Sequence, residues 1–202
     1  MDVYSESVGG SYANLYASSA CREKVKPNAK IDFYIGNLAP DCISDKEKKH
    51  IVHLRKTPDR EAALKEMTLK TDDKNEYLQG MVLHLFVDWK WDSLILPVFA
   101  EKNGEEWYTK YGDEGGFLES YAFHHTDWAY VLWEQMDLCD AFDFVETDSI
   151  TMESIKAEIT RSRKWKMETK IGPSTELPPS MIEKFANDTA VDFAKWISGL
   201  RG

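Results

Sequence analysis

The sequence predicts an all-α fold, a single-domain helical bundle that spans residues 1–202. The chain has 202 residues, of which 43% are apolar, and this is enough to bury one substantial core. Signals for the start of a helix recur along it. We find no run of alternating apolar and polar residues bounded by the Asn-Gly or Asp-Gly turns that join β-strands. Helices packed around one core are therefore the expected architecture.

Two helices are predicted in the first third of the chain. Ser44 lies three residues before Glu47, which is the spacing of a capping box, because each side chain can satisfy the other's free backbone N–H. Thr57 and Pro58 precede a run of good helix formers, and a proline at the first helical position forfeits no hydrogen bond. We expect one helix to begin at each of these places.

The rest of the chain is also predicted to be helical. Three segments are too long and too continuous for single strands: residues 75–95, 117–138 and 150–168. Ser180 and Glu183 repeat the capping-box spacing ahead of an apolar pattern with the helical period. The chain is therefore expected to end on an amphipathic helix near residues 180–200 that packs on the core.

Charge and composition narrow the classes of partner. The chain has 35 acidic and 25 basic residues, and its formal net charge of -10 disfavours non-specific binding to nucleic acid or to an anionic membrane. There is no stretch of 18 apolar residues and no basic-then-apolar leader pattern, so we expect a cytoplasmic protein without stable membrane insertion. Three widely spaced cysteines predict neither a disulfide framework nor a thiolate zinc site. The sequence leaves the oligomeric state open.

The segment LQGMVLHLFVDWKWDSL, residues 78–94, places a histidine and an aspartate inside an otherwise apolar helix. His84 and Asp88 are four positions apart, so they lie on one face of that helix, about one turn from each other. Imidazole nitrogen and carboxylate oxygen are common ligands of zinc and similar ions, but a site needs three or four of them. The plainer interpretation is a buried His–Asp hydrogen bond between helices, and the local pattern favours it.

Two further polar groups precede this segment. His50 and His53 are three positions apart in a predicted helix, with His50 expected on the surface and His53 closer to the buried side. Asp41 follows Gly36 and Pro40, which predict a turn that presents the carboxylate from the end of a segment. A cap or turn role is the plainer interpretation of Asp41 on local grounds.

Three segments in order, GNLAPD (36–41), KHIVHL (49–54) and GMVLHLFVDWKW (80–91), resemble the pattern of the zinc-dependent phospholipase C family. The resemblance covers roughly residues 10–130. It implies an all-α bundle of the phospholipase C and single-strand nuclease type, which agrees with the helices predicted above. It also implies four metal ligands: Asp41, His53, His84 and Asp88. Of these, Asp88 is the carboxylate expected to bridge two ions.

The family supplies further ligands from a later region, which in this chain is ESYAFHHTDWAYVL, residues 119–132. The resemblance implies His124 as a ligand there, with Glu119, His125 or Asp127 as alternatives. Asp127 and Glu119 are also the candidates for a general base that acts on an attacking water. Without the resemblance, the favoured interpretation of His124 and His125 is one partly exposed histidine beside one core histidine.

One departure from the family pattern lies in SYANLYAS, residues 11–18, where Asn14 stands in place of a histidine that helps to bind a further ion. Asparagine is a poor zinc ligand, but its amide oxygen can coordinate an ion or hydrogen-bond a bound water. The resemblance therefore implies one to three ions, zinc or another divalent metal, with Asn14 as an altered ligand.

Together these residues predict a metal-dependent hydrolase in which an ion-activated water attacks a phosphodiester or phosphomonoester. The expected partner is a small phosphorylated or lipid-like substrate. Four tryptophans are candidates for the wall of its cleft, although such residues more often belong to the core: Trp89, Trp91, Trp107 and Trp128. One alternative is a catalytically silent helical protein that keeps a structural or sensing metal site, which Asn14 favours. The other is a helical interaction module.

Overall fold

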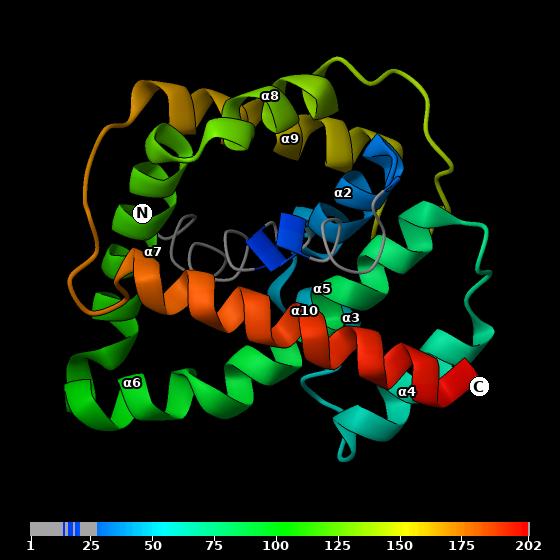
Figure 1. Ribbon diagram of the computed structural model, residues 1–202, viewed down its shortest axis with the longest axis horizontal. Helices are drawn as coiled ribbons and strands as arrows, with labels where there is room; N and C mark the ends of the chain where they lie inside the picture. Colours follow the sequence, from blue (N-terminus) through cyan, green and yellow to red (C-terminus); the bar gives the residue numbers. More distant parts are fainter. Residues whose placement is uncertain (1–13, 15, 18, 21–27, 202) are drawn as a thin grey trace.

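Helices account for the regular secondary structure of the computed structural model, which describes residues 14, 16–17, 19–20 and 28–201 (Figure 1). The described residues contain no strand, so the prediction of an all-α, single-domain fold is confirmed. In chain order the elements are α2 (Ile31–Leu38), η1 (Ala39–Cys42), α3 (Lys46–Val52), α4 (Arg60–Lys70), α5 (Glu76–Leu94), α6 (Leu96–Asn103), η2 (Gly104–Glu106), α7 (Trp107–His125), α8 (Asp127–Asp137), α9 (Met152–Glu168) and α10 (Pro179–Arg201). None of the described helices combines the length and apolar composition needed to cross a bilayer.

Short polar side chains cap the N-termini of three successive helices, α3, α4 and α5. Asp45, Asp59 and Asn75 cap α3, α4 and α5, and each accepts a hydrogen bond from a backbone N–H in the first turn. Two predictions of helix starts are corrected by these caps. The α3 cap is not Ser44 but the residue after it, and Pro58 lies before the α4 cap and outside the helix.

The long helix predicted over residues 117–138 is two helices, α7 and α8. Thr126 lies between them with an extended backbone (φ -118°, ψ 114°), which ends α7 at His125 and lets α8 begin at Asp127 in a new direction. In α9, Thr151 and Ser154 form a reciprocal capping box. The last helix, α10, covers the region where an amphipathic helix was expected, and it lies across α5 (Figure 1).

The helix α5 occupies the centre of the bundle and packs against α2, α4, α6 and α10. Its closest neighbour is α2, and two glycines permit the approach. A Cβ atom on Gly36 would overlap the carbonyl oxygen of Tyr77, and a Cβ atom on Gly80 would overlap the carbonyl oxygen of Phe33. The prediction of a turn at Gly36 is therefore wrong, because this glycine lies inside α2 and serves as a packing contact.

Candidate metal centre and adjoining cavity

Three of the predicted ligands converge from three separate elements. Asp41 lies in η1, His53 is the residue that ends α3, and His84 lies near the middle of α5. One donor atom from each residue lies within 4.8 Å of the other two. The two histidines are almost completely buried, with 1% and 0% of their surface exposed. One carboxylate and two imidazoles form a donor set that suits zinc and similar divalent ions.

Both imidazole rings are held through Nδ1. The Nδ1 atom of His53 lies 2.5 Å from Oδ2 of Asp88, and Nδ1 of His84 lies 2.6 Å from the carbonyl oxygen of Asn37. An oxygen acceptor at Nδ1 requires the proton there, which assigns Nε2 of each ring to metal binding. Metal-ligating histidines in proteins are usually oriented in this way. Nε2 of His53 also lies 3.2 Å from the carbonyl oxygen of Pro40, a hydrogen bond that it donates only while it carries a proton.

The segment Gly36-x-x-x-Pro40-Asp41 has a physical role in this arrangement. The close contact through Gly36 brings the last turn of α2 onto α5, which places the Asn37 carbonyl beside His84. Pro40 has no backbone N–H, so it cannot donate a hydrogen bond to the Asn37 carbonyl oxygen three residues earlier. That oxygen accepts a hydrogen bond from Nδ1 of His84 instead. The short helix η1 then presents the carboxylate of Asp41.

His53 and Arg55 both reach Asp88 because the chain reverses between them. Leu54 has a left-handed backbone conformation, with φ of 57°, and the N–H of Arg55 donates to the carbonyl oxygen of His50 at 2.9 Å. This is the helix-ending pattern that normally uses glycine at the reversal. A leucine in that conformation costs about 1–2 kcal/mol. The strain therefore lies in the segment that positions two residues of the cluster.

Asp88 lies beside the three ligands as the acceptor of several hydrogen bonds. Besides His53, its carboxylate accepts from Nδ2 of Asn14 at 3.2 Å and from Nη2 of Arg55 at 3.1 Å. Nη2 of Arg60 lies 3.9 Å from the same carboxylate. The residue predicted to bridge two ions is thus surrounded by donors in this structure, and the bridging role stays a prediction. Asn14, which is predicted as an altered ligand, lies beside Asp88, and its role as a ligand stays a prediction.

The burial of these charges is offset by their neighbours. Burial raises the pKa of Asp41, but electrostatic interactions with Lys49, His84 and His53 together outweigh it, so the pKa lies below its usual range. Burial also raises the pKa of Asp88, but electrostatic interactions with His53 and His84, the hydrogen bond from His53 and the nearby charge of Arg55 bring it well below its usual range. Burial lowers the pKa of His84, against the opposing pull of both carboxylates. The lowered pKa favours the neutral imidazole form of His84, which is the form that binds a metal ion.

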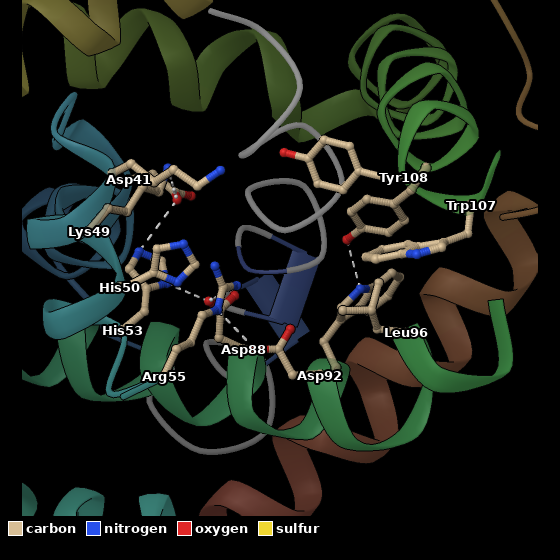
Figure 2. Close-up of a pocket in the computed structure, with 13 residues that line it drawn as sticks. Asp41, Lys49, His50, His53, Arg55, Asp88, Asp92, Leu96, Trp107 and Tyr108 are labelled. Atoms are coloured by element: carbon tan, nitrogen blue, oxygen red, sulfur yellow. Dashed lines mark hydrogen bonds and ion pairs between the residues drawn. The ribbon is translucent and has the colours of Figure 1, made fainter. Parts of the chain in front are cut away.

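A cavity of about 400 Å³ opens beside the cluster (Figure 2). Asp41, His53 and Asp88 lie in its wall, and the aromatic side chains of Trp107 and Tyr108 lie across the cavity from Asp41 and His53. The basic groups of the wall come from α3 and the turn after it, and they are Lys46, Lys49, His50 and Arg55. The remaining aromatic groups are Trp91 from α5 and Tyr111 from α7. The cluster can therefore be reached by a small molecule that is anionic at one end and apolar at the other.

The candidate general bases lie elsewhere. Glu119 is buried in α7, where its carboxylate accepts a hydrogen bond from Nζ of Lys166 at 2.7 Å. Asp127 is exposed at the first position of α8. Neither residue lines the cavity. The structure brings Asp41, His53 and His84 together without them.

The two adjacent histidines at the end of α7 are both exposed. Nε2 of His124 lies 2.9 Å from the carbonyl oxygen of Thr169, and the ring of His125 stacks on Tyr121 with 3.9 Å between ring centroids. Neither histidine lines the cavity. The expectation that one of them belongs to the core is wrong, because the last turn of α7 projects both into solvent.

Of the four tryptophans considered as candidates for the wall of a cleft, two line the cavity and two do not. Trp91 and Trp107 line the cavity, whereas Trp89 packs on Phe86 in the core and Trp128 packs on Tyr16.

Sequence analysis missed the charged partners of the cluster. Arg55 and Arg60 donate to Asp92 at 3.0 and 2.7 Å, and Lys49 lies 3.0 Å from Asp41. The position of Asp92, one helical turn beyond Asp88 on α5, is a signal that would have found it. The arginines carry no such signal, because their pairing depends on how α4 meets α5.

Comparisons with protein-family models, with curated proteins and with solved structures found no match. The resemblance to the zinc-dependent phospholipase C family therefore rests on the sequence segments, and it stays a prediction.

Proposed function

We propose that the protein is a metal-dependent hydrolase of small phosphoesters. The observation that carries this proposal is the convergence of Asp41, His53 and His84 beside a cavity, with both histidines fixed through Nδ1. Two of the three residues line the cavity, so an ion held by them would be reachable from it. Three protein ligands beside an open space are typical of catalytic zinc sites, whereas structural sites use four ligands and are closed.

A divalent ion at this position, zinc or another, would supply a Lewis acid for a phosphoryl oxygen and a means of activating water. The side chains provide the remaining functions. Lys49 and Arg55 line the cavity and can hold anionic oxygens, which an acidic chain does not otherwise attract. Trp107 and Tyr108 can contact the apolar part of a small phosphorylated or lipid-like substrate. The proposed setting is the cytoplasm, without a nucleic-acid or membrane partner.

The test is hydrolysis of a chromogenic phosphomonoester and phosphodiester by protein stripped with a chelator and then supplied with zinc, manganese or magnesium. We expect turnover only with an ion present, and His84→Gln should reduce it to the level of the stripped protein. His125→Gln is the matched control, because this histidine is exposed and outside the cavity. Turnover that chelation or His84→Gln leaves unchanged would refute the proposal, as would its absence with every ion.

The charge balance of the cluster favours a second candidate, the catalytically silent helical protein. Ion pairs match three carboxylates with three basic side chains: Asp41, Asp88 and Asp92 with Lys49, Arg55 and Arg60. A buried cluster of this kind is electrically satisfied by its own residues. A silent protein with a structural or sensing ion would lose stability on chelation but show no turnover. A helical interaction module would show neither effect.

A further inference from the structure

We propose that this centre holds a single divalent ion, because the guanidinium groups of Arg55 and Arg60 lie against Asp88, the carboxylate that the sequence resemblance predicts to bridge two ions. The inference rests on the proposed metal-dependent function. It adds the number of ions and the groups that replace the second one.

The first observation is that both oxygen atoms of Asp88 are already used. Oδ2 accepts from Nδ1 of His53 and from Nη2 of Arg55, and Oδ1 accepts from Nδ2 of Asn14. A carboxylate has about four acceptor positions, and these three donors leave at most one of them for a second ion. The donor it would meet on the cavity side is Arg55, which lines the cavity.

The second observation is that the two arginines are held in place by another carboxylate. Asp92 lies one turn beyond Asp88 on α5, and its Oδ2 accepts from Nε of Arg55 at 3.0 Å and from Nη1 of Arg60 at 2.7 Å. The side chain of Arg60 is only 13% exposed, and that of Arg55 is 30% exposed. A guanidinium group keeps its charge at any working pH. These two fixed charges therefore repel a second cation permanently.

At the proposed ion-binding position between Asp41, His53 and His84, the competing positive charge is held less firmly. The competing cation is Lys49, which contacts Oδ1 of Asp41 at 3.0 Å. An ammonium group on a flexible stem makes a single-point contact and can withdraw into the adjoining cavity, which Lys49 lines. A first ion can therefore displace Lys49, whereas a second ion cannot displace two arginines that are each bound to Asp92.

Arg55 then has a role toward the substrate. Arg55 lines the cavity, whereas Arg60 is not among the described residues of its wall. Arg55 therefore places a permanent positive charge beside the proposed single ion. We assign it the binding of an anionic phosphoryl oxygen, which a second ion performs in two-metal sites.

The test is the zinc content of the full-length protein after dialysis against zinc and then against metal-free buffer, measured by plasma mass spectrometry. We expect one zinc per chain in the wild type. The double variant Arg55→Ala/Arg60→Ala should bind two, because Asp88 and Asp92 lose their cationic partners. The matched control is Arg161→Ala/Arg163→Ala, which removes the same charge from α9 and should stay at one.

Two zinc ions in the wild type would overturn this inference and leave the proposed function intact, whereas no zinc would overturn both. A folded double variant that still binds one zinc would also overturn the inference. The wild-type measurement decides the question even where the double variant does not fold.

Discussion

At the scale of single residues, the cluster depends on oriented hydrogen bonds between buried polar groups. Asp88 is the common acceptor, because His53, Arg55 and Asn14 all donate to it. Removing the charge of a shared acceptor leaves several buried donors without their partner, and this costs more than the loss of any one hydrogen bond.

Asp88→Asn should therefore lower the free energy of unfolding by about 3 kcal/mol. Urea denaturation followed by circular dichroism measures this. Asp188→Asn is the matched control, since Asp188 is exposed and forms an ion pair with Lys184 on the surface of α10. That variant should change stability little. Equal effects of the two substitutions would contradict the account of Asp88 as the shared acceptor.

Glu114 gives a prediction of pH dependence away from the metal centre. Its carboxylate accepts from the hydroxyl group of Ser174 and from the backbone N–H groups of Thr175 and Glu176. Burial raises the pKa of Glu114, but these hydrogen bonds outweigh it and bring the pKa below its ordinary value of 4.5. The stabilisation is therefore present above pH 4.5 and is lost as the pH falls through the lower pKa of the folded state.

Glu114→Gln should be less stable than the wild type near neutral pH, and the difference should shrink in acid. Urea denaturation at a series of pH values tests this. A difference that persists unchanged at pH values well below 4.5 would show that Glu114 acts through packing and not through its charge.

At the scale of elements, the contact between α2 and α5 determines the geometry of the centre. Gly36 and Gly80 let the two helices touch through their backbones, and this contact places the Asn37 carbonyl against His84. A side chain on either glycine would separate the helices and move that acceptor away from the imidazole.

Gly80→Ala should lower the free energy of unfolding by about 2–3 kcal/mol and weaken zinc binding. Gly199→Ala is the matched control, because a Cβ atom at this position of α10 meets no atom within 4 Å. That variant should be unchanged or slightly more stable, because alanine is the better helix former. Thermal denaturation and zinc titration measure both effects, and unchanged zinc affinity in Gly80→Ala would contradict the role of the helix contact.

The helices were predictable from sequence where the pattern was long and continuous. Residues 75–95 and 150–168 were expected as helices and are α5 and α9. The break at Thr126 was missed because neither glycine nor proline marks it. Local sequence predicts a turn at Gly36 because its packing partner, Tyr77, lies 41 positions further on, and local sequence does not reveal such a contact.

At the scale of the whole molecule, the centre depends on contacts between segments that are distant in the chain. Asp41, His53 and His84 were expected from the order and spacing of three segments, and the structure brings them together. The sequence could not place Glu119 and His124, because their positions depend on how α7 packs on its neighbours. The ion pairs of Arg55 and Arg60 with Asp92 are unpredictable for the same reason. They join the turn after α3 and the start of α4 to α5.

The central claim is that an ion binds between Asp41, His53 and His84. Anomalous X-ray diffraction at the zinc edge, from crystals grown with zinc, tests it most directly. We expect one peak at about 2.0–2.2 Å from Nε2 of each histidine and from a carboxylate oxygen of Asp41. The absence of a peak there, or a peak only at other residues, would contradict the claim.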